Sequence, residues 1–293
     1  MKPILFQYRS RKLHTDDIAF IKVLVDRHFL RGRSYISREL CTSWNWMQPN
    51  GKLKEYAARD LLLRLEEQGL VALPPRIRPK NNLKPRVFEQ IPLFVKRTLE
   101  GTITEYETLT IQVVKGHQES YLWGYLLHHY HYLGNPKLVG EHIRHIVRIG
   151  NQVVACLGWA SAAWKVKDRD RFIGWDETTK RTHLHLIASN VRFLIPPWVT
   201  IKHLASKVLS LALRRLSHDW KAVYGHPVYL AETFVDTSRF QGTCYQAANW
   251  IRAGKTQGSS KRGNTYQYHG QPKELYLYPL HRNFRRFLAH DQG

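Results

Sequence analysis

The chain has 293 residues, of which 43% are hydrophobic, and its lysines and arginines outnumber its acidic residues by 22. A length of this order predicts about two domains. An excess of positive charge this large favours a polyanionic partner. The basic residues are interspersed with nine tryptophans, which favours nucleic acid over a membrane surface as the partner.

Several other classes of protein are excluded by the sequence. No segment is long and apolar enough to span a bilayer, and the apolar run at the N-terminus is too short for a signal peptide. Cys41, Cys156 and Cys244 are odd in number and far apart, which argues against a disulfide framework and a zinc site. We therefore expect a cytoplasmic protein with free thiols, no membrane partner and no bound cofactor. A role for magnesium and assembly into a homo-oligomer stay open.

Three helices are predicted near the start of the chain, over residues 16–27, 34–44 and 53–68, where apolar residues recur three and four apart. Gly69 is a typical C-terminal cap for the third helix, and the apolar run 70–73 follows it as a short strand.

Three helices followed by a strand are typical of a winged helix-turn-helix, so residues 1–75 are predicted to form a DNA-binding domain of that kind. The third helix would be the recognition helix. Its predicted DNA contacts are Lys52, Lys54, Arg59 and Arg64. The alternative is a small helical bundle that mediates protein contacts. Residues 76–116 are predicted to be a basic linker and connecting segment, and residues 117–293 a mixed α/β domain.

A candidate reaction centre lies in residues 232–258. The apolar run 228–236 predicts a buried strand, and it carries Glu232 and Asp236 near its C-terminal end, where open α/β sheets usually build their sites. The two carboxylates would leave one face of the strand about 13 Å apart, too far to share a metal ion directly. The alternatives are that Glu232 pairs with an arginine and that Asp236 caps the following turn.

Cys244 and Tyr245 are the candidate nucleophiles, since they fall in the first turn of a short helix that follows this strand. The positive end of a helix dipole favours thiolate and phenolate. The alternative is that both side chains simply pack in a core.

Further basic residues are candidates for contacts with DNA. Arg169, Arg171 and Trp175 combine cations with an indole, which suits an extruded base or a single strand. The alternative puts Trp175 in the core and the arginines in solvent. Lys255, Lys261 and Arg262 would hold the scissile phosphate.

Several motifs give the chain a family resemblance: YHYLG at Tyr130–Gly134, SAAW at Ser161–Trp164, NVRFLI at Asn190–Ile195 and GTCYQAANW at Gly242–Trp250. The chain resembles the DruA family over residues 121–258. This family takes its name from a protein of the Druantia anti-phage system, and its stand-alone members resemble transposon-borne proteins.

The predicted order of elements is also similar to that of GNAT-type acyltransferases. The hairpin would be residues 145–161, the central strand 190–195 and the helix 205–215; a strand at 228–236 and a tyrosine-bearing helix follow. Tyr245 would be a general acid in such an enzyme. However, residues 196–203 contain two prolines and no glycine, whereas a backbone cradle for a pyrophosphate needs glycine.

The predicted fold is therefore α+β: a winged helix-turn-helix-like domain followed by a GNAT-like domain. The predicted function is that of a transposase-like, DNA-binding enzyme of a mobile element or an antiviral defence locus, which cleaves and transfers DNA strands. Cys244 or Tyr245 would attack, and Glu232 would act as a base or as an orienting group. The alternatives are a non-catalytic DNA-binding subunit of a defence complex and an acyltransferase.

Overall fold

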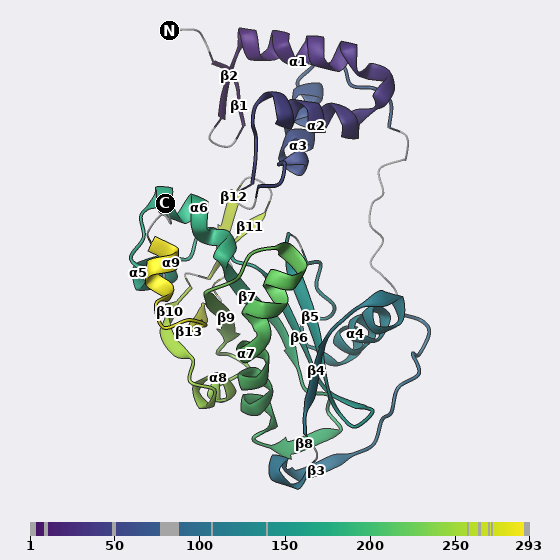
Figure 1. Cartoon of the computed structure of the whole chain (residues 1–293), viewed down its shortest axis with the longest axis vertical. Helices are drawn as coiled ribbons and strands as arrows, with labels where there is room; N and C mark the ends of the chain where they lie inside the picture. Colours follow the sequence, from purple (N-terminus) through teal and green to yellow (C-terminus); the bar gives the residue numbers. More distant parts are fainter. Residues whose placement is uncertain are drawn as a thin grey trace. The chain divides into compact units, whose positions relative to one another are not determined.

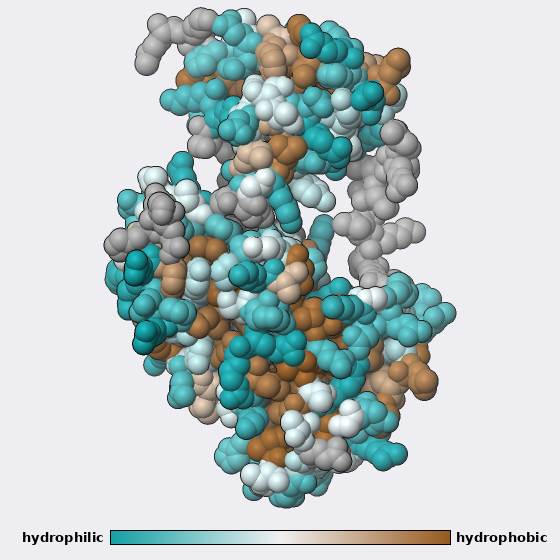
Figure 2. Space-filling model, in the orientation of Figure 1, coloured by the Kyte–Doolittle hydropathy of each residue, from teal (hydrophilic) through white to brown (hydrophobic). Residues whose placement is uncertain are grey.

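The computed structural model describes residues 4–8, 11–48, 51–76, 88–106, 108–138, 140–256, 258–262, 265–268, 270 and 272–289. They belong to two compact units, residues 1–86 and 87–293, whose helices and strands are drawn in Figure 1. Hydrophilic residues predominate on the face of each unit seen in Figure 2, with apolar ones scattered between them. Among the described residues, no helix has both the length and the apolar character needed to cross a membrane.

The first unit opens with a β-hairpin and continues with helices. The hairpin joins β1 (Ile4–Tyr8) to β2 (Arg11–His14). The helices are α1 (Thr15–Arg27), the 3₁₀ turn η1 (Phe29–Arg31), α2 (Arg33–Ser43) and α3 (Glu55–Glu67).

Apolar residues one helical turn apart form the core of the first unit. Leu61 and Leu65 of α3 are fully buried, as are Ile36 and Leu40 of α2. Arg33 ties the two helices together, because its guanidinium donates to both carboxylate oxygens of Glu66 over 2.8 and 2.9 Å.

The first unit differs from the winged helix-turn-helix that the sequence predicts. The three helices are present, but residues 70–76 form no strand, and the only hairpin among the unit's described residues precedes α1. The apolar run at Leu70–Leu73 instead packs its side chains into the core: Val71 and Leu73 are buried, and Leu70 packs against them. Residues 77–87 of the predicted linker lie outside the described residues.

The second unit is built on a central sheet. In chain order its strands are β4 (Thr110–Val113), β5 (His142–Ile149), β6 (Gln152–Ser161), β7 (Ile187–Leu194), β9 (Leu230–Asp236), β10 (Ile251–Lys255) and β13 (Lys273–Pro279). They lie side by side in the order β10-β13-β9-β7-β6-β5-β4. All neighbours are antiparallel except β7 and β9, which are parallel.

The other elements flank this sheet. The helices are α4 (Gly116–Tyr130), α5 (Lys167–Ile173), α6 (Glu177–His183), α7 (Leu204–Tyr224), α8 (Thr243–Ala247) and α9 (Phe284–Ala289), with 3₁₀ turns η2 (Ile103–Glu105) and η3 (Leu184–Leu186). β3 (Leu99–Thr102) pairs in parallel with β8 (Val199–Lys202), and β11 (Ser259–Arg262) forms a hairpin with β12 (Thr265–Tyr268).

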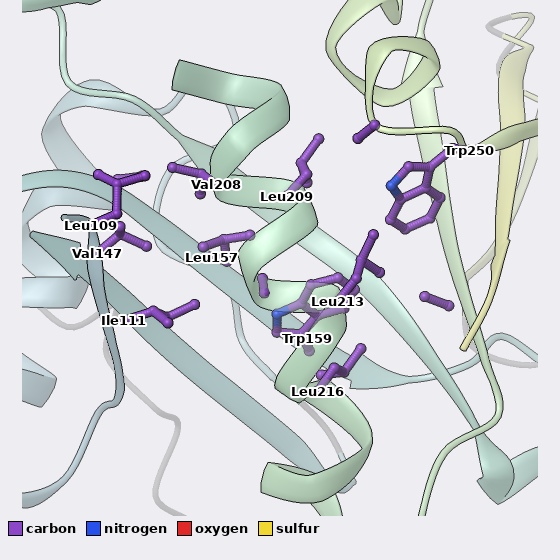
Figure 3. Close-up of a cluster of buried hydrophobic side chains, with 14 of the residues drawn as sticks. Leu109, Ile111, Val147, Leu157, Trp159, Val208, Leu209, Leu213, Leu216 and Trp250 are labelled. Atoms are coloured by element: carbon purple, nitrogen blue, oxygen red, sulfur yellow. The ribbon is translucent and has the colours of Figure 1, made fainter. Parts of the chain in front are cut away.

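Side chains alternate along the strands and so pack on both faces of the sheet. On one face α7 covers the sheet, and Figure 3 shows its Leu213 and Leu216 beside Trp159 of β6. On the other face, α4 packs over β5 and β6, and α5 and α9 pack over β9 and β13. Successive residues of each strand therefore contribute to clusters on opposite faces of the sheet.

The predicted GNAT-like order of elements is present. Residues 142–161 form the β5–β6 hairpin, β7 is the central strand and α7 the helix; β9, α8 and β10 follow in turn. β4 and β3 lie in the segment expected to be a connection, and β4 is the edge strand of the main sheet.

Candidate functional site

A pocket lies where two parallel strands part. β7 and β9 pair over only four residues each, Ile187–Asn190 and Leu230–Thr233. Beyond them β7 stays paired with β6 as far as Leu194, while β9 stays paired with β13 as far as Asp236. The two diverging strand ends line a pocket of about 620 Å³.

The short helix α8 forms one wall of this pocket with Cys244 and Tyr245. The chain enters α8 through Gly242, whose φ of +71° favours glycine. A Cβ atom at Gly242 would lie 2.6 Å from the hydroxyl oxygen of Tyr276, a buried side chain of β13. Backbone conformation and space together therefore require glycine where α8 begins.

Asn190 holds the point at which the strands part. β7 has one extra residue, Val191, opposite the Gly158–Trp159 step of β6. The Asn190 amide fills this bulge, since its Nδ2 donates to the carbonyl oxygens of Gly158 (3.2 Å) and Arg192 (3.1 Å). Its Oδ1 accepts a hydrogen bond from the hydroxyl of Tyr245 over 3.0 Å.

Tyr245 and Cys244 are both protonated groups at neutral pH. Burial raises the pKa of the Tyr245 phenol far above its usual range, and it also raises the pKa of the Cys244 thiol. The expected lowering by a helix dipole is not found, because α8 has only five residues and burial outweighs it. Each group would therefore have to lose its proton as it attacks.

Arg192 of β7 supplies positive charge to the pocket lining. It also fixes the adjoining loop, because its guanidinium donates to the carbonyl oxygens of Gly134 (2.9 Å), Val191 (2.7 Å) and Leu133 (3.3 Å). His131 lines the pocket too, and burial, with a smaller effect of Arg192, lowers its pKa to about 4. Its imidazole is therefore neutral at pH 7, and its Nδ1 accepts a hydrogen bond from the amide of Leu133 over 3.1 Å.

Asp236 and Lys273 face one another in the register of β9 and β13, and both line the pocket. Asp236 accepts hydrogen bonds from the amide and the hydroxyl of Ser238. These bonds lower the pKa of its carboxyl. Asp236 thus organises the turn after β9, as the capping alternative predicts.

Glu232 lies outside this pocket, contrary to the single reaction centre that the sequence suggests. Alternation along β9 points Thr233 toward the α7 face, where its hydroxyl donates to the Asn190 carbonyl over 3.0 Å. Glu232 points to the opposite face, where it is fully buried and accepts a hydrogen bond from Arg169 over 3.0 Å. Burial raises the pKa of Glu232, and Arg169 opposes that rise.

The predicted DNA contact at Arg169 is replaced by this ion pair. The Arg169 side chain is fully buried and also donates to Asp170 and to the carbonyl oxygen of Ala163. Its guanidinium lies 5.8 Å from the ring of the half-buried Trp175, which packs into the core on that face. Arg171 is exposed, with its guanidinium 3.7 Å from Asp168.

The remaining residues that were predicted to contact DNA belong to β10, to β11 and to the first unit. Lys255 of β10 is exposed, and its amide donates to Asp168. Lys261 and Arg262 belong to β11, but their side chains lie outside the described part of the chain. In the first unit Arg59 donates to Ser34 and Arg64 to Asp60, whereas Lys52 is exposed and Lys54 half-buried.

The sequence did not single out several pocket residues: Tyr132, Asn190, Arg192, Phe240 and Lys273. Asn190 and Arg192 did carry a signal, because an amide and a guanidinium interrupt the otherwise apolar run NVRFLI. The described part of the chain holds no group of three or more histidine, cysteine or acidic side chains placed to bind a metal ion.

Comparison with protein families gives one match: the model described as Druantia protein DruA matches residues 66–264. No curated protein matches the chain.

Comparison with solved structures finds acetyltransferases. An N-acetyltransferase from Staphylococcus aureus Mu50 is 9% identical, with a TM-score of 0.38 over 59% of this chain and 99% of that chain. A GNAT-family acetyltransferase from Streptococcus pneumoniae is 13% identical, with a TM-score of 0.37 over 59% and 99%. AAC(6')-Ib in complex with ribostamycin and coenzyme A is 12% identical, with a TM-score of 0.41 over 63% and 99%. Likenesses this distant carry no argument about activity.

Proposed function

The chain belongs to the DruA family, which suggests a role in a defence system, and from this premise we propose that it processes DNA strands in the pocket between β7 and β9. One observation carries the proposal. Two candidate nucleophiles, Cys244 and Tyr245, line the same pocket as two cations, Arg192 and Lys273. Transfer of a phosphoryl group needs an attacking group and positive charge near the phosphorus, so this combination suits DNA chemistry.

Net charge supports DNA as the partner. A formal charge of +22 and a sequence pI near 10 attract the phosphate backbone whatever its sequence. In the first unit we assign the contact with duplex DNA to α3 and the residues before it. There Tyr56 is 85% exposed with Arg59 beside its ring, and Lys52 is exposed. We propose that this unit binds DNA in the manner of a winged-helix domain.

The reaction would proceed through a covalent intermediate. The sulfur of Cys244 or the phenol oxygen of Tyr245 attacks a backbone phosphorus, and the bond from phosphorus to one deoxyribose oxygen breaks. The nucleophile's proton passes to a water molecule as the bond to phosphorus forms. The leaving oxygen takes a proton and becomes a free hydroxyl. A hydroxyl of a second strand reverses the attack and completes the transfer.

Incubation of the protein with end-labelled DNA tests this proposal. Single-stranded and duplex DNA are each used with and without magnesium, and a denaturing gel separates cleaved DNA from protein–DNA adducts. We expect an adduct that is lost in either Cys244→Ser or Tyr245→Phe. Tyr278→Phe is the matched control, because this half-buried tyrosine of β13 does not line the pocket.

Two other outcomes would replace the proposal. Cleavage that depends on magnesium and leaves no adduct means hydrolysis by a metal-activated water. DNA binding without cleavage, unchanged in both variants, means a non-catalytic DNA-binding subunit.

An acyltransferase is the second candidate, since protonated Tyr245 at the parting of β7 and β9 is suited to donate a proton to a leaving group. The segment between β7 and α7 opposes it. There residues 199–202 form β8 and pair with β3, and no glycine stands between Ile195 and Leu204. Calorimetry with acetyl-CoA decides this point: binding that Tyr245→Phe leaves intact, together with acyl transfer that it abolishes, would favour the acyltransferase.

A further inference from the structure

Two exposed aromatic rings stand at the pocket between β7 and β9. Tyr132, just after α4, is 39% exposed, and Phe240, after β9, is 48% exposed. Both line the pocket, and their ring centroids are 5.2 Å apart. The guanidinium of Arg239 lies 4.8 Å from the Tyr132 ring. We call Tyr132, Phe240 and Arg239 the aromatic platform.

The platform is held in place by bonds that do not involve its rings. Arg192 binds the carbonyl oxygens of Leu133 and Gly134, directly after Tyr132. On the other side, the amides of Arg239 and Phe240 both donate to the carbonyl oxygen of Asp236, over 3.1 and 2.9 Å. The segments that carry the two rings are thus fixed in place, while Tyr132 and Phe240 keep 39% and 48% of their surfaces exposed. A side chain that is already held in position loses less conformational entropy when it binds a ligand.

Charge lies beside the rings in the same cavity. The cations Arg192 and Lys273 line the pocket along with the platform and with Cys244 and Tyr245 of α8. A ligand that complements this set has a flat aromatic part for the rings and a negative group for the cations. The pocket volume of about 620 Å³ is within the usual range for sites that take small molecules or a single nucleotide unit.

We propose that the aromatic platform stacks an unpaired DNA base, so that the strand enters this pocket single-stranded or as an unpaired end. A base inside a duplex has both faces covered by its neighbours, whereas a single strand presents every base to an aromatic side chain. The backbone phosphate of the stacked nucleotide then lies toward Arg192 and Lys273. This inference rests on the proposed function and names its substrate class.

Binding measurements with an abasic strand test the inference. Fluorescence anisotropy compares a short oligo-dT with an abasic deoxyribose-phosphate strand of equal length, so the two ligands differ in bases but not in phosphate charge. A duplex of the same length is the third ligand. The protein carries Cys244→Ser and Tyr245→Phe together, which separates binding from reaction.

We expect oligo-dT to bind about 5- to 100-fold more tightly than the abasic strand, as base stacking on aromatic side chains predicts. Tyr132→Leu and Phe240→Leu should each bring this ratio toward one. Tyr132→Phe and Phe240→Tyr keep a ring in the same place and should preserve the ratio. Thermal unfolding of each variant confirms that it is folded.

A ratio near one in the parent protein, or a ratio unchanged in both leucine variants, overturns the inference. Equal or tighter binding of the duplex overturns it as well. The failure of the proposed function is a distinct result. In that case no strand is cleaved by the protein with native Cys244 and Tyr245, while the base-dependent ratio and its loss in the leucine variants still identify the platform as a binding site.

Discussion

Arg169 and Glu232 form an ion pair across 3.0 Å in which both side chains are fully inaccessible to solvent. The pair joins α5 to β9 on the face of the sheet opposite Tyr245. The sequence predicted a DNA contact at Arg169 and a catalytic role for Glu232, whereas in the structure the two side chains connect a helix to the sheet. Removal of one partner from a buried pair leaves a charge without compensation, whereas removal of both does not.

Arg169→Met should therefore lower the free energy of unfolding by ~3–5 kcal/mol. The double variant Arg169→Met with Glu232→Leu should recover most of that loss, and Arg171→Met, on the exposed side of α5, should change stability by less than ~0.5 kcal/mol. Urea unfolding measures all three. If Arg169→Met weakens DNA binding without loss of stability, Arg169 is a DNA contact after all.

Gly242→Ala should damage the site more than its backbone conformation alone explains. A residue other than glycine in the left-handed region costs ~1–2 kcal/mol. Gly225→Ala is the matched control, since Gly225 has a similar φ of +84° with nothing within 4 Å of an added Cβ. At Gly242 that Cβ would also collide with Tyr276, so the loss of stability by urea unfolding should be larger. Equal losses of stability in the two variants would show that the Tyr276 side chain moves aside without a loss of unfolding free energy.

Stability should fall as the pH is lowered from about 6.5 to about 4. Burial lowers the pKa of His131 and of His185 to about 4, below the 6.5 of the unfolded chain. In that window the unfolded state binds more protons than the folded state, so acid favours unfolding. Replacement of both histidines by glutamine should flatten the dependence of unfolding free energy on pH. An unchanged slope in the double variant contradicts this assignment.

Binding to duplex DNA should weaken steeply with salt, because each neutralised phosphate releases counterions. If Lys52 and Lys54 both contact phosphates, the Lys52→Ala, Lys54→Ala variant should reduce the slope of log K against log salt by about 2. The exposed Lys207 of α7 is the control, and its exchange for alanine should leave the slope as it is. Equal slopes for all three proteins would show that Lys52 and Lys54, which precede α3, do not contact phosphates.

Some strands and helices of the second unit were predictable because their apolar residues follow a recognisable pattern, whereas β3 and β4 lie in a segment that was expected to be a connection. The run VYLAETFVD gives β9 close to its observed bounds, and LASKVLSLALRRL gives the start of α7, which continues beyond the predicted end to Tyr224. The position of β13 between β9 and β10 was not predictable, since strand order depends on contacts distant in sequence. The face to which Glu232 points was not predictable either, because a shift of one residue in the strand register would bring Glu232 to the face that Thr233 occupies.

The candidate site was predictable only in part for the same physical reason. Cys244 and Tyr245 drew attention through their own chemistry, and they do line the pocket. Tyr132 and Phe240 come from segments more than a hundred residues apart, and only the tertiary fold brings them together. The strand predicted after α3, at residues 70–73, is absent, because an apolar run of four residues fits a buried loop as well as a strand.

Mass spectrometry of the trapped reaction tests the central claim most directly. The protein is mixed with a short single-stranded DNA, denatured, and digested with nuclease and trypsin. Cleavage after Arg239 and Arg252 yields the peptide Phe240–Arg252, which contains both candidate nucleophiles. We predict that this peptide carries a nucleotide phosphate on Cys244 or on Tyr245. Strand cleavage with this peptide unmodified, or with the nucleotide on another residue, would contradict the account.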